Sequence, residues 1–94
     1  MASQRADIDQ WKIEAVRTYL QDQFTESRID HFPRGNHTAV LFLVMERGSV
    51  AHQLLVTKKF LDRFTDTLSM RDALGSAEAV LRLRQAGQKT VELH

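Results

Sequence analysis

The segment that most constrains the fold is the apolar run Thr38–Met45, TAVLFLVM. An uninterrupted run of this length, rich in β-branched and aromatic side chains, is typical of a buried strand. The turn Glu46–Ser49 and a second apolar run, Val50–Val56, follow it, so we predict a hairpin. Successive side chains of a strand point to opposite faces, and here both faces are apolar. Both faces must therefore be covered, either by the chain's own helices or by a second copy.

The residues before this hairpin predict one long amphipathic helix. Apolar side chains recur at three- and four-residue spacing over Ile8–Phe24, and Asp7 with Gln10 resembles a capping arrangement. Trp11 and Tyr19 share a face of this helix, and we expect both to lie in the core or in an interface.

Between the helix and the hairpin, Arg28–Phe32 is predicted to be a short strand that ends at Pro33. Proline has no N–H to donate to a neighbouring strand, so this strand is expected at the edge of a sheet.

A helix is predicted directly after the hairpin. Thr57 is a suitable N-cap because its hydroxyl can accept a hydrogen bond from a backbone N–H of the first turn. The apolar stripe of this helix consists of Phe60, Leu61, Phe64 and Leu68.

Further along, Ser69 and Asp72 form a capping box that restarts the helical pattern, and Gly75-Ser76 breaks or kinks it. Gly87 is expected as a left-handed cap at the end of the last helix. Thr90–Leu93 alternates apolar and polar residues and is predicted to be a final short strand.

The predicted fold class is α+β, with element order α-β-β-β-α-α-β in a single compact domain over residues 1–94. Residues 1–6 are predicted to be a disordered N-terminus. A three- to four-stranded antiparallel meander packs with one long N-terminal helix and two C-terminal helical segments, because the links between the first strands are too short for a crossover.

The helices can take opposite faces of this sheet, or all take one face and leave the other to a second copy. On the third strand, Leu54 and Val56 share a face with His52, whereas the other face mixes polar and apolar residues. A mixed face suits an interface, so we favour a homodimer. The predicted interface residues are Leu41, Leu43, Met45 and Leu55.

The composition excludes several classes of protein. A hydrophobic share of 43% and a charged share of 27% are those of an ordinary soluble domain. The chain has no cysteine, which excludes disulfides, thiol nucleophiles and thiolate metal sites, and makes the cytoplasm the expected location. The first residues contain no apolar signal-peptide core, and the longest apolar run, Ala39–Met45, is too short to cross a bilayer.

No catalytic motif is recognisable, so we predict a protein that is not an enzyme and has no cofactor. Ser49 and Ser76 lie beside glycines, but neither is in a G-x-S-x-G motif. Three histidines, His31, His37 and His52, are weak candidates for a metal site, because they lack the spacing of a known motif.

Nucleic-acid binding is the alternative function, through the basic residues of the second half of the chain. Lysines are unfavourable at the N-terminus of a helix unless their charge meets a ligand such as a phosphate. The candidate residues are Lys58, Lys59, Arg63, Arg82, Arg84 and Lys89.

The order α-β-β-β-α, with paired lysines at the start of the last helix, is similar to that of a double-stranded-RNA-binding domain. The likeness covers about residues 8–68 and implies an RNA duplex as the partner. The chain departs from the family pattern where Phe60, Leu61 and Asp62 replace its third basic residue and small residues, and it adds a helix and a strand.

Overall fold

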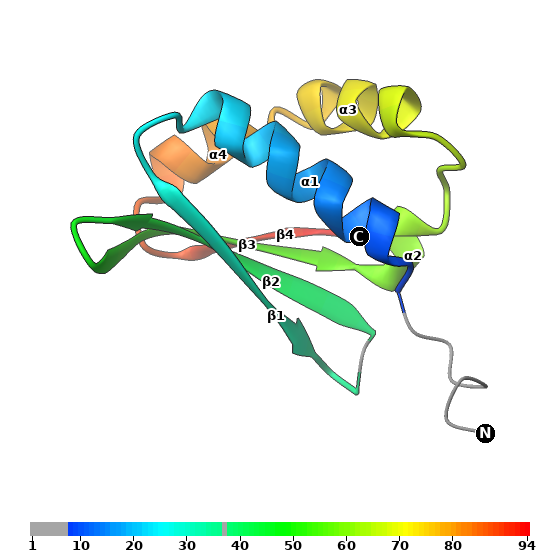
Figure 1. Ribbon diagram of the computed structural model, residues 1–94, viewed down its shortest axis with the longest axis horizontal. Helices are drawn as coiled ribbons and strands as arrows, with labels where there is room; N and C mark the ends of the chain where they lie inside the picture. Colours follow the sequence, from blue (N-terminus) through cyan, green and yellow to red (C-terminus); the bar gives the residue numbers. More distant parts are fainter. Residues whose placement is uncertain (1–7, 37) are drawn as a thin grey trace.

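The computed structural model describes residues 8–36 and 38–94, and over these residues it has the predicted α+β architecture (Figure 1). The predicted disordered segment 1–6 and the capping residue Asp7 lie outside the described residues. The elements are α1 Gln10–Gln23, β1 Arg28–Arg34, β2 Ala39–Glu46, β3 Ser49–Thr57, α2 Lys58–Leu61, α3 Thr67–Ser76, α4 Ala79–Ala86 and β4 Thr90–Leu93.

The four strands form one sheet in the order β1-β2-β3-β4. The pairs β1–β2 and β2–β3 are antiparallel as predicted, but β4 runs parallel to β3. The prediction of a purely antiparallel sheet is therefore wrong at its last strand. The reason is that α2, α3 and α4 form a crossover connection, which returns the chain to the end of the sheet from which β3 started.

The edge position predicted for the first strand is confirmed, since β1 pairs only with β2 within the described sheet. Its predicted end is wrong, because β1 continues through Pro33 to Arg34, and Pro33 lies opposite Val40. An edge strand tolerates a proline because the missing N–H does not interrupt a ladder on both sides.

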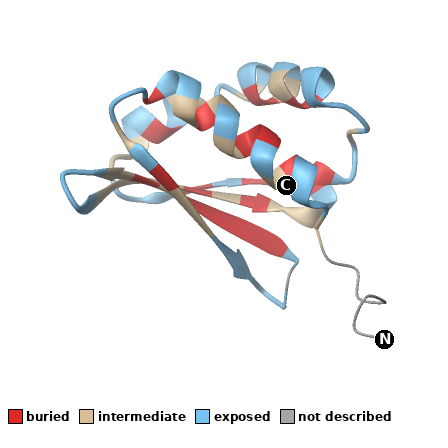
Figure 2. Ribbon diagram, in the orientation of Figure 1, coloured by how far each residue is buried: buried red, intermediate tan, exposed pale blue. Residues whose placement is uncertain are grey.

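The helices α1, α3 and α4 all lie on the same side of the sheet (Figure 1). Figure 2 shows buried segments in these helices and in the strands beneath them. Of the two arrangements left open by the sequence, residues 8–36 and 38–94 adopt the one with these helices on one face, and none of their helices covers the other face. Beneath the helices, the sheet contributes a fully buried apolar layer, and each such large side chain stabilises the fold by about 1.5–3 kcal/mol. The layer includes Phe42, Val44, Leu54 and Val56.

The buried face of α1 is made by side chains four residues apart. Lys12, Val16 and Leu20 are buried, whereas Trp11 is 38% exposed. Of the pair predicted to lie in the core or in an interface, Tyr19 packs against the core. Trp11 is not part of the core, because the stripe centred on Val16 leaves it at the border. The residue that caps α1 is Asp9, which makes no side-chain cap hydrogen bond.

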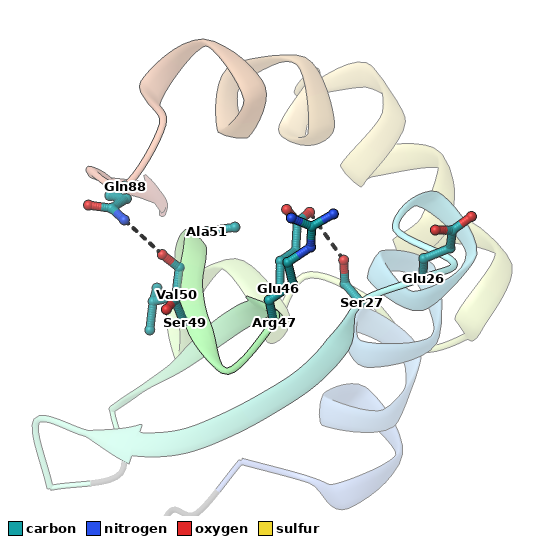
Figure 3. A pocket seen from close by; sticks show the side chains of 8 residues that line it. All are labelled: Glu26, Ser27, Glu46, Arg47, Ser49, Val50, Ala51 and Gln88. Atoms are coloured by element: carbon teal, nitrogen blue, oxygen red, sulfur yellow. Dashed lines mark hydrogen bonds between the residues drawn. The ribbon is translucent and has the colours of Figure 1, made fainter.

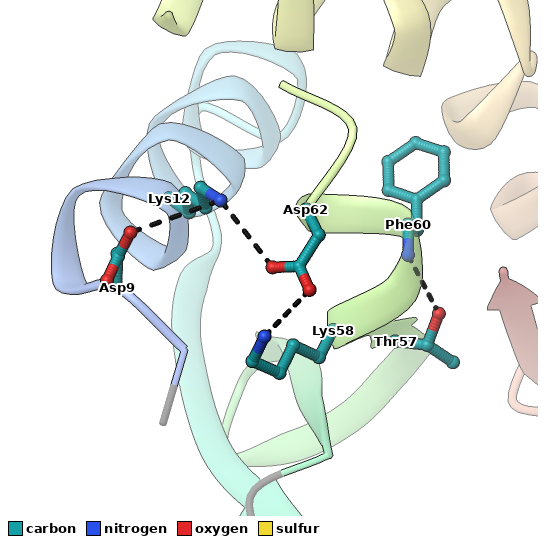
Figure 4. A network of polar contacts seen from close by, with 6 residues as sticks. All are labelled: Asp9, Lys12, Thr57, Lys58, Phe60 and Asp62. Atoms are coloured by element: carbon teal, nitrogen blue, oxygen red, sulfur yellow. Dashed lines mark hydrogen bonds and ion pairs between the residues drawn. The ribbon is translucent and has the colours of Figure 1, made fainter. Parts of the chain in front are cut away.

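Lys12 is the one buried charged residue within the described part of the chain. Its Nζ lies 3.7 Å from Asp62 Oδ1 and 4.0 Å from Asp9 Oδ2, and Lys58 Nζ lies 2.7 Å from Asp62 Oδ2 (Figure 4). The hydrogen bond from Lys58 lowers the pKa of the Asp62 carboxyl, and the charge of Lys12 adds to this effect. This network ties the start of α1 to the end of α2.

Thr57 is confirmed as the N-cap of α2, because its Oγ1 accepts a hydrogen bond from Phe60 N at 3.2 Å. The helix is much shorter than predicted and ends at Leu61. Leu68, the last member of the predicted stripe, lies on α3 and is 72% exposed. The stripe therefore did not mark one continuous helix.

The N-cap of α3 is Asp66, whose Oδ1 accepts a hydrogen bond from Ser69 N at 2.7 Å. The predicted capping box of Ser69 and Asp72 is therefore wrong, since Ser69 already lies inside the helix and donates to the cap. The break at Gly75-Ser76 is confirmed, because α3 ends at Ser76. Gly87 caps α4 with φ 61° and ψ −124°, a positive φ but not the left-handed helical conformation that was predicted.

Candidate interaction surface on the open face of the sheet

The side of the sheet that faces away from α1, α3 and α4 carries a cluster of apolar side chains, and we call this side the open face. It receives alternate residues of each strand, so that β2 turns Val40, Phe42 and Val44 to the helices and the residues between them to the open face. The large apolar residues at the centre of the open face are Phe32, Leu41, Leu43, Met45 and Leu55, and the smaller Ala39 and Val50 share this face.

The five large side chains differ in how far their own neighbours cover them. Phe32, on the edge strand, is 49% exposed. Leu41 is only 6% exposed because flanking strands shield it, while Leu43, Met45 and Leu55 are half-buried. A contiguous apolar cluster on a sheet face that no described helix covers is a surface suited to a partner.

The strand register arranges the open face in rows that run across the sheet. Phe32 pairs with Leu41, which pairs with Leu55, which pairs with Glu92. One row therefore crosses all four strands from an exposed aromatic ring to a carboxylate. The neighbouring row consists of Asp30, Leu43, Gln53 and Thr90.

Charged side chains border the apolar cluster on both edge strands. On β1, Arg28 Nη2 forms an ion pair with Asp30 Oδ2 at 3.0 Å, whereas Arg34 forms no ion pair within residues 8–36 and 38–94. On β4, Glu92 Oε1 lies 2.9 Å from His94 Nε2. The two edges thus offer opposite charges, a guanidinium on β1 and a carboxylate on β4.

A shallow groove of about 310 Å³ crosses the open face between these charges. Its floor is apolar, because Leu41 and Leu55 lie beneath it. One flank is fixed by Gln53, whose Oε1 accepts a hydrogen bond from Thr90 Oγ1 at 3.4 Å and whose Nε2 donates to Gln88 O at 2.9 Å. The residues that line the groove are Arg34, Leu41, Gln53, Leu55, Thr90 and Glu92.

The structure brings the four predicted interface residues, Leu41, Leu43, Met45 and Leu55, together on this one face. The sequence reasoning missed Phe32, Arg34 and Glu92. The signal for the first two was the alternation in RIDHFPR, which sends every second residue of β1 to the open face once the strand is extended through Pro33.

A second, polar hollow of about 480 Å³ lies at the β2–β3 hairpin (Figure 3). Its polar groups pair largely with one another: Ser27 Oγ donates to Glu46 Oε2 at 3.2 Å, and Gln88 Nε2 donates to Val50 O at 3.1 Å. None of the described residues that line it is a histidine, so it lacks a side chain that titrates near neutral pH. These hydrogen bonds hold the β2–β3 hairpin against Ser27 and Gln88.

The histidine candidates are not brought together by the fold. His31 on β1 and His52 on β3 both face the helices but are separated by β2. His52 Nδ1 lies 3.2 Å from Gly87 O, and its ring centroid lies 5.2 Å from that of Phe24. His37 lies outside the described residues. Within the described residues, no group of three or more potential ligands could hold a metal ion.

The six basic candidates fall into two groups at different places on the molecule. One group lies on α2 or just after it. The other lies on α4 or just after it, in a different part of the molecule (Figure 1). Several of these charges already have intramolecular contacts. Lys58 pairs with Asp62, and the guanidinium of Arg84 lies 5.0 Å from the centroid of the Phe24 ring. The first group is Lys58, Lys59 and Arg63, and the second is Arg82, Arg84 and Lys89.

Comparisons of the chain with protein-family models, with curated proteins and with solved structures find no match. Among the described residues, no helix has both the length and the apolar character needed to cross a membrane.

Proposed function

We propose that this protein is a non-enzymatic interaction module of the cytoplasm that self-associates through the open face of its sheet. The observation that carries the proposal is the clustering of Phe32, Leu41, Leu43, Met45 and Leu55 on the sheet face that no helix of the described residues covers.

Physical chemistry supports a protein partner on this face. Apolar area removed from water contributes about 25 cal/mol per Å² to association, and two sheets pack face to face at a separation of about 10 Å. Phe32 has apolar area that a partner could still bury, since about half of its surface faces solvent. Aromatic anchors of this kind contribute disproportionately to binding at protein interfaces.

A second copy of the chain is the partner that needs no further assumption, because an isologous contact uses the same patch on both subunits. The polar residues between the apolar ones give this face the mixed character of an interface. Gln53 and Thr90, for example, already bond to one another or to the backbone, so covering them leaves few polar groups without partners.

The test is sedimentation velocity over a wide range of protein concentration, with the chain and two variants. We expect a reversible dimer of twice the 10.8 kDa chain mass, and a monomer for Leu43→Glu, because the added carboxylate would be buried at the centre of the contact. Leu68→Glu is the matched control, since Leu68 is exposed on α3 and far from the open face. A single species of 10.8 kDa at all concentrations would refute self-association.

A further inference from the structure

We propose that Met45 is an oxidation site through which a peroxide regulates the open face, a role that rests on the proposed function. Oxidation of the Met45 thioether to the sulfoxide weakens the contact between two copies of the chain, and reduction of the sulfoxide restores that contact.

The first argument is the difference in exposure between the two methionines that the structure describes. Met70 on α3 is 0% exposed and belongs to the core cluster. Met45 on β2 is half-buried and is not among the apolar residues that pack in or against that cluster. Its side chain lies on the open face, because the preceding residue, Val44, is fully buried beneath the helices. A dissolved oxidant can therefore reach Met45 in the monomer, whereas the fold shields Met70.

The second argument is the sulfur chemistry that remains to a chain without cysteine. The thioether of methionine is then the side-chain sulfur that an oxidant can attack, and its first product is the sulfoxide. With hydrogen peroxide, a sulfur lone pair attacks one oxygen, so that an S–O bond forms as the O–O bond breaks. The hydroxide that leaves takes the proton from the attached oxygen, and the products are the sulfoxide and water. Sulfur is oxidised and the peroxide is reduced.

The third argument is the position of Met45 within the open face. Met45 lies two residues from Leu43 on β2, and it pairs with Arg28 on β1 and with Val50 on β3. Oxidation converts this apolar side chain into a polar one whose oxygen accepts hydrogen bonds. In the monomer, water can donate to that oxygen. A second copy over the face removes this water, and a polar oxygen buried without a donor is unfavourable.

The fourth argument is that the cationic residue opposite Met45 is already engaged. Arg28 donates to Asp30 Oδ2 from Nε at 3.2 Å and from Nη2 at 3.0 Å. These two hydrogen bonds direct the guanidinium along β1 toward Asp30, and not across the sheet to β2. The sulfoxide of Met45 would therefore have to break an existing ion pair to gain these donors when the face is covered.

The test begins with mild hydrogen peroxide treatment of the full chain, followed by peptide mapping with mass spectrometry. Trypsin cleaves after arginine, so that Met45 lies in the peptide 35–47 and Met70 in the peptide 64–71. We expect the first peptide to gain one oxygen well before the second, with an unchanged circular dichroism spectrum. Equal rates for the two peptides in the folded chain would contradict selective oxidation of Met45.

The effect on association is measured by sedimentation velocity of the chain oxidised at Met45. We expect its dimer Kd to be at least about tenfold higher than that of the untreated chain, and methionine sulfoxide reductases should restore the original value. Met45→Leu is the matched control, because leucine has a similar volume and no sulfur. Its Kd should stay close to that of the untreated chain and should not respond to peroxide.

A second measurement uses the competition between the oxidant and a second copy for the same side chain. Because the dimer covers Met45, its oxidation rate should fall in proportion to the fraction of monomer as the protein concentration is raised. A rate that stays constant while the chain passes from monomer to dimer would place Met45 outside the contact.

The results separate this regulation from self-association itself. If the untreated chain dimerises and Leu43→Glu prevents it, but complete oxidation of Met45 leaves Kd unchanged, the regulation is wrong and the open face remains the interface. If the untreated chain stays monomeric at all concentrations, self-association and its regulation are both wrong.

Discussion

Lys12 Nζ lies 3.7 Å from Asp62 Oδ1, and this contact joins the first turn of α1 to the residue that ends α2. The side chain of Lys12 is buried, whereas that of Asp62 is half exposed. An ammonium group in such a place needs its counter-charge, since a buried charge without a partner is costly.

The first prediction is that Asp62→Asn lowers the free energy of unfolding by about 1 kcal/mol near neutral pH, because it leaves Lys12 with only the 4.0 Å contact to Asp9. Urea denaturation measures this change. Asp72→Asn is the control, since Asp72 is exposed and forms no ion pair within the described residues. Equal losses for the two variants would contradict the role assigned to Asp62.

The same contact predicts a pH dependence. The pKa of Asp62 is lowered in the folded protein from its ordinary value of 3.8, chiefly by the hydrogen bond from Lys58. The stability that the carboxylate contributes is therefore fully present above pH 3.8 and is lost as the pH falls through the lower folded-state pKa. We expect the difference in unfolding free energy between the chain and Asp62→Asn to shrink over that acidic range, and a difference that grows there would contradict the assignment.

The second prediction concerns the cap of α3. Asp66→Ala removes the acceptor for Ser69 N and should cost about 1 kcal/mol of stability. Asp66→Asn keeps a side-chain oxygen and should cost less. Ser69→Ala removes only the hydroxyl that donates to Asp66 Oδ2, so thermal and urea unfolding should place it near the unmodified chain. A larger loss for Ser69→Ala than for Asp66→Ala would show that the cap is misassigned.

The third prediction separates binding from folding at Phe32. Phe32→Ala should raise the dimer Kd about tenfold or more, which is about 1.4 kcal/mol, because the ring is the exposed aromatic anchor of the open face. The unfolding free energy of the monomer, measured at a concentration below Kd, should change by less than that of a core leucine, for which removal costs about 2–5 kcal/mol. Leu68→Ala is the matched control for an exposed apolar side chain outside the interface. Unchanged dimerisation in Phe32→Ala would remove this residue from the contact.

The fourth prediction addresses the alternative function. A short RNA duplex should show no saturable binding even at low salt, because the basic residues around Lys58 and around Arg84 lie in separate places and partly in intramolecular contacts. Fluorescence anisotropy against salt concentration is the measurement. Saturable binding whose affinity falls steeply with salt would instead favour nucleic-acid recognition, since that slope reports the release of counterions from phosphates.

Alternation along a strand was enough to predict the two faces of β2 and the four apolar interface candidates. Alternation does not carry the direction of a strand, however, and so β4 was placed in the sheet without its parallel orientation. The direction of β4 depends on the length and path of the connection from β3, and the helix boundaries predicted for that connection were wrong. The break between α2 and α3 was missed because the predicted apolar stripe runs across it, from Phe60 and Leu61 on α2 through Phe64 to Leu68 on α3.

Side chains that depart from their usual environment were the least predictable part of the site. Lysine is usually exposed and tryptophan usually buried, but here Lys12 is covered and Trp11 is the more open of the two. The pairing of Lys12 with Asp62 joins positions on separate helices, and no local spacing signals such a contact. For the same reason, the position of the opposite charges of Arg34 and Glu92 on the two edge strands could be recognised only from the strand order.

The parallel pairing of β4 with β3 affects the order in which the parts of the sheet can fold. Thr90 lies opposite Gln53, a partner made 37 positions earlier, and Val91 and Leu93 complete the burial beside Leu54 and Val56. During synthesis, the edge of β3 that pairs with β4 has no neighbouring strand until Thr90–Leu93 has left the ribosome. A chain that ended before Thr90 would leave that edge of β3 without its neighbouring strand and would lose the buried side chains of Val91 and Leu93.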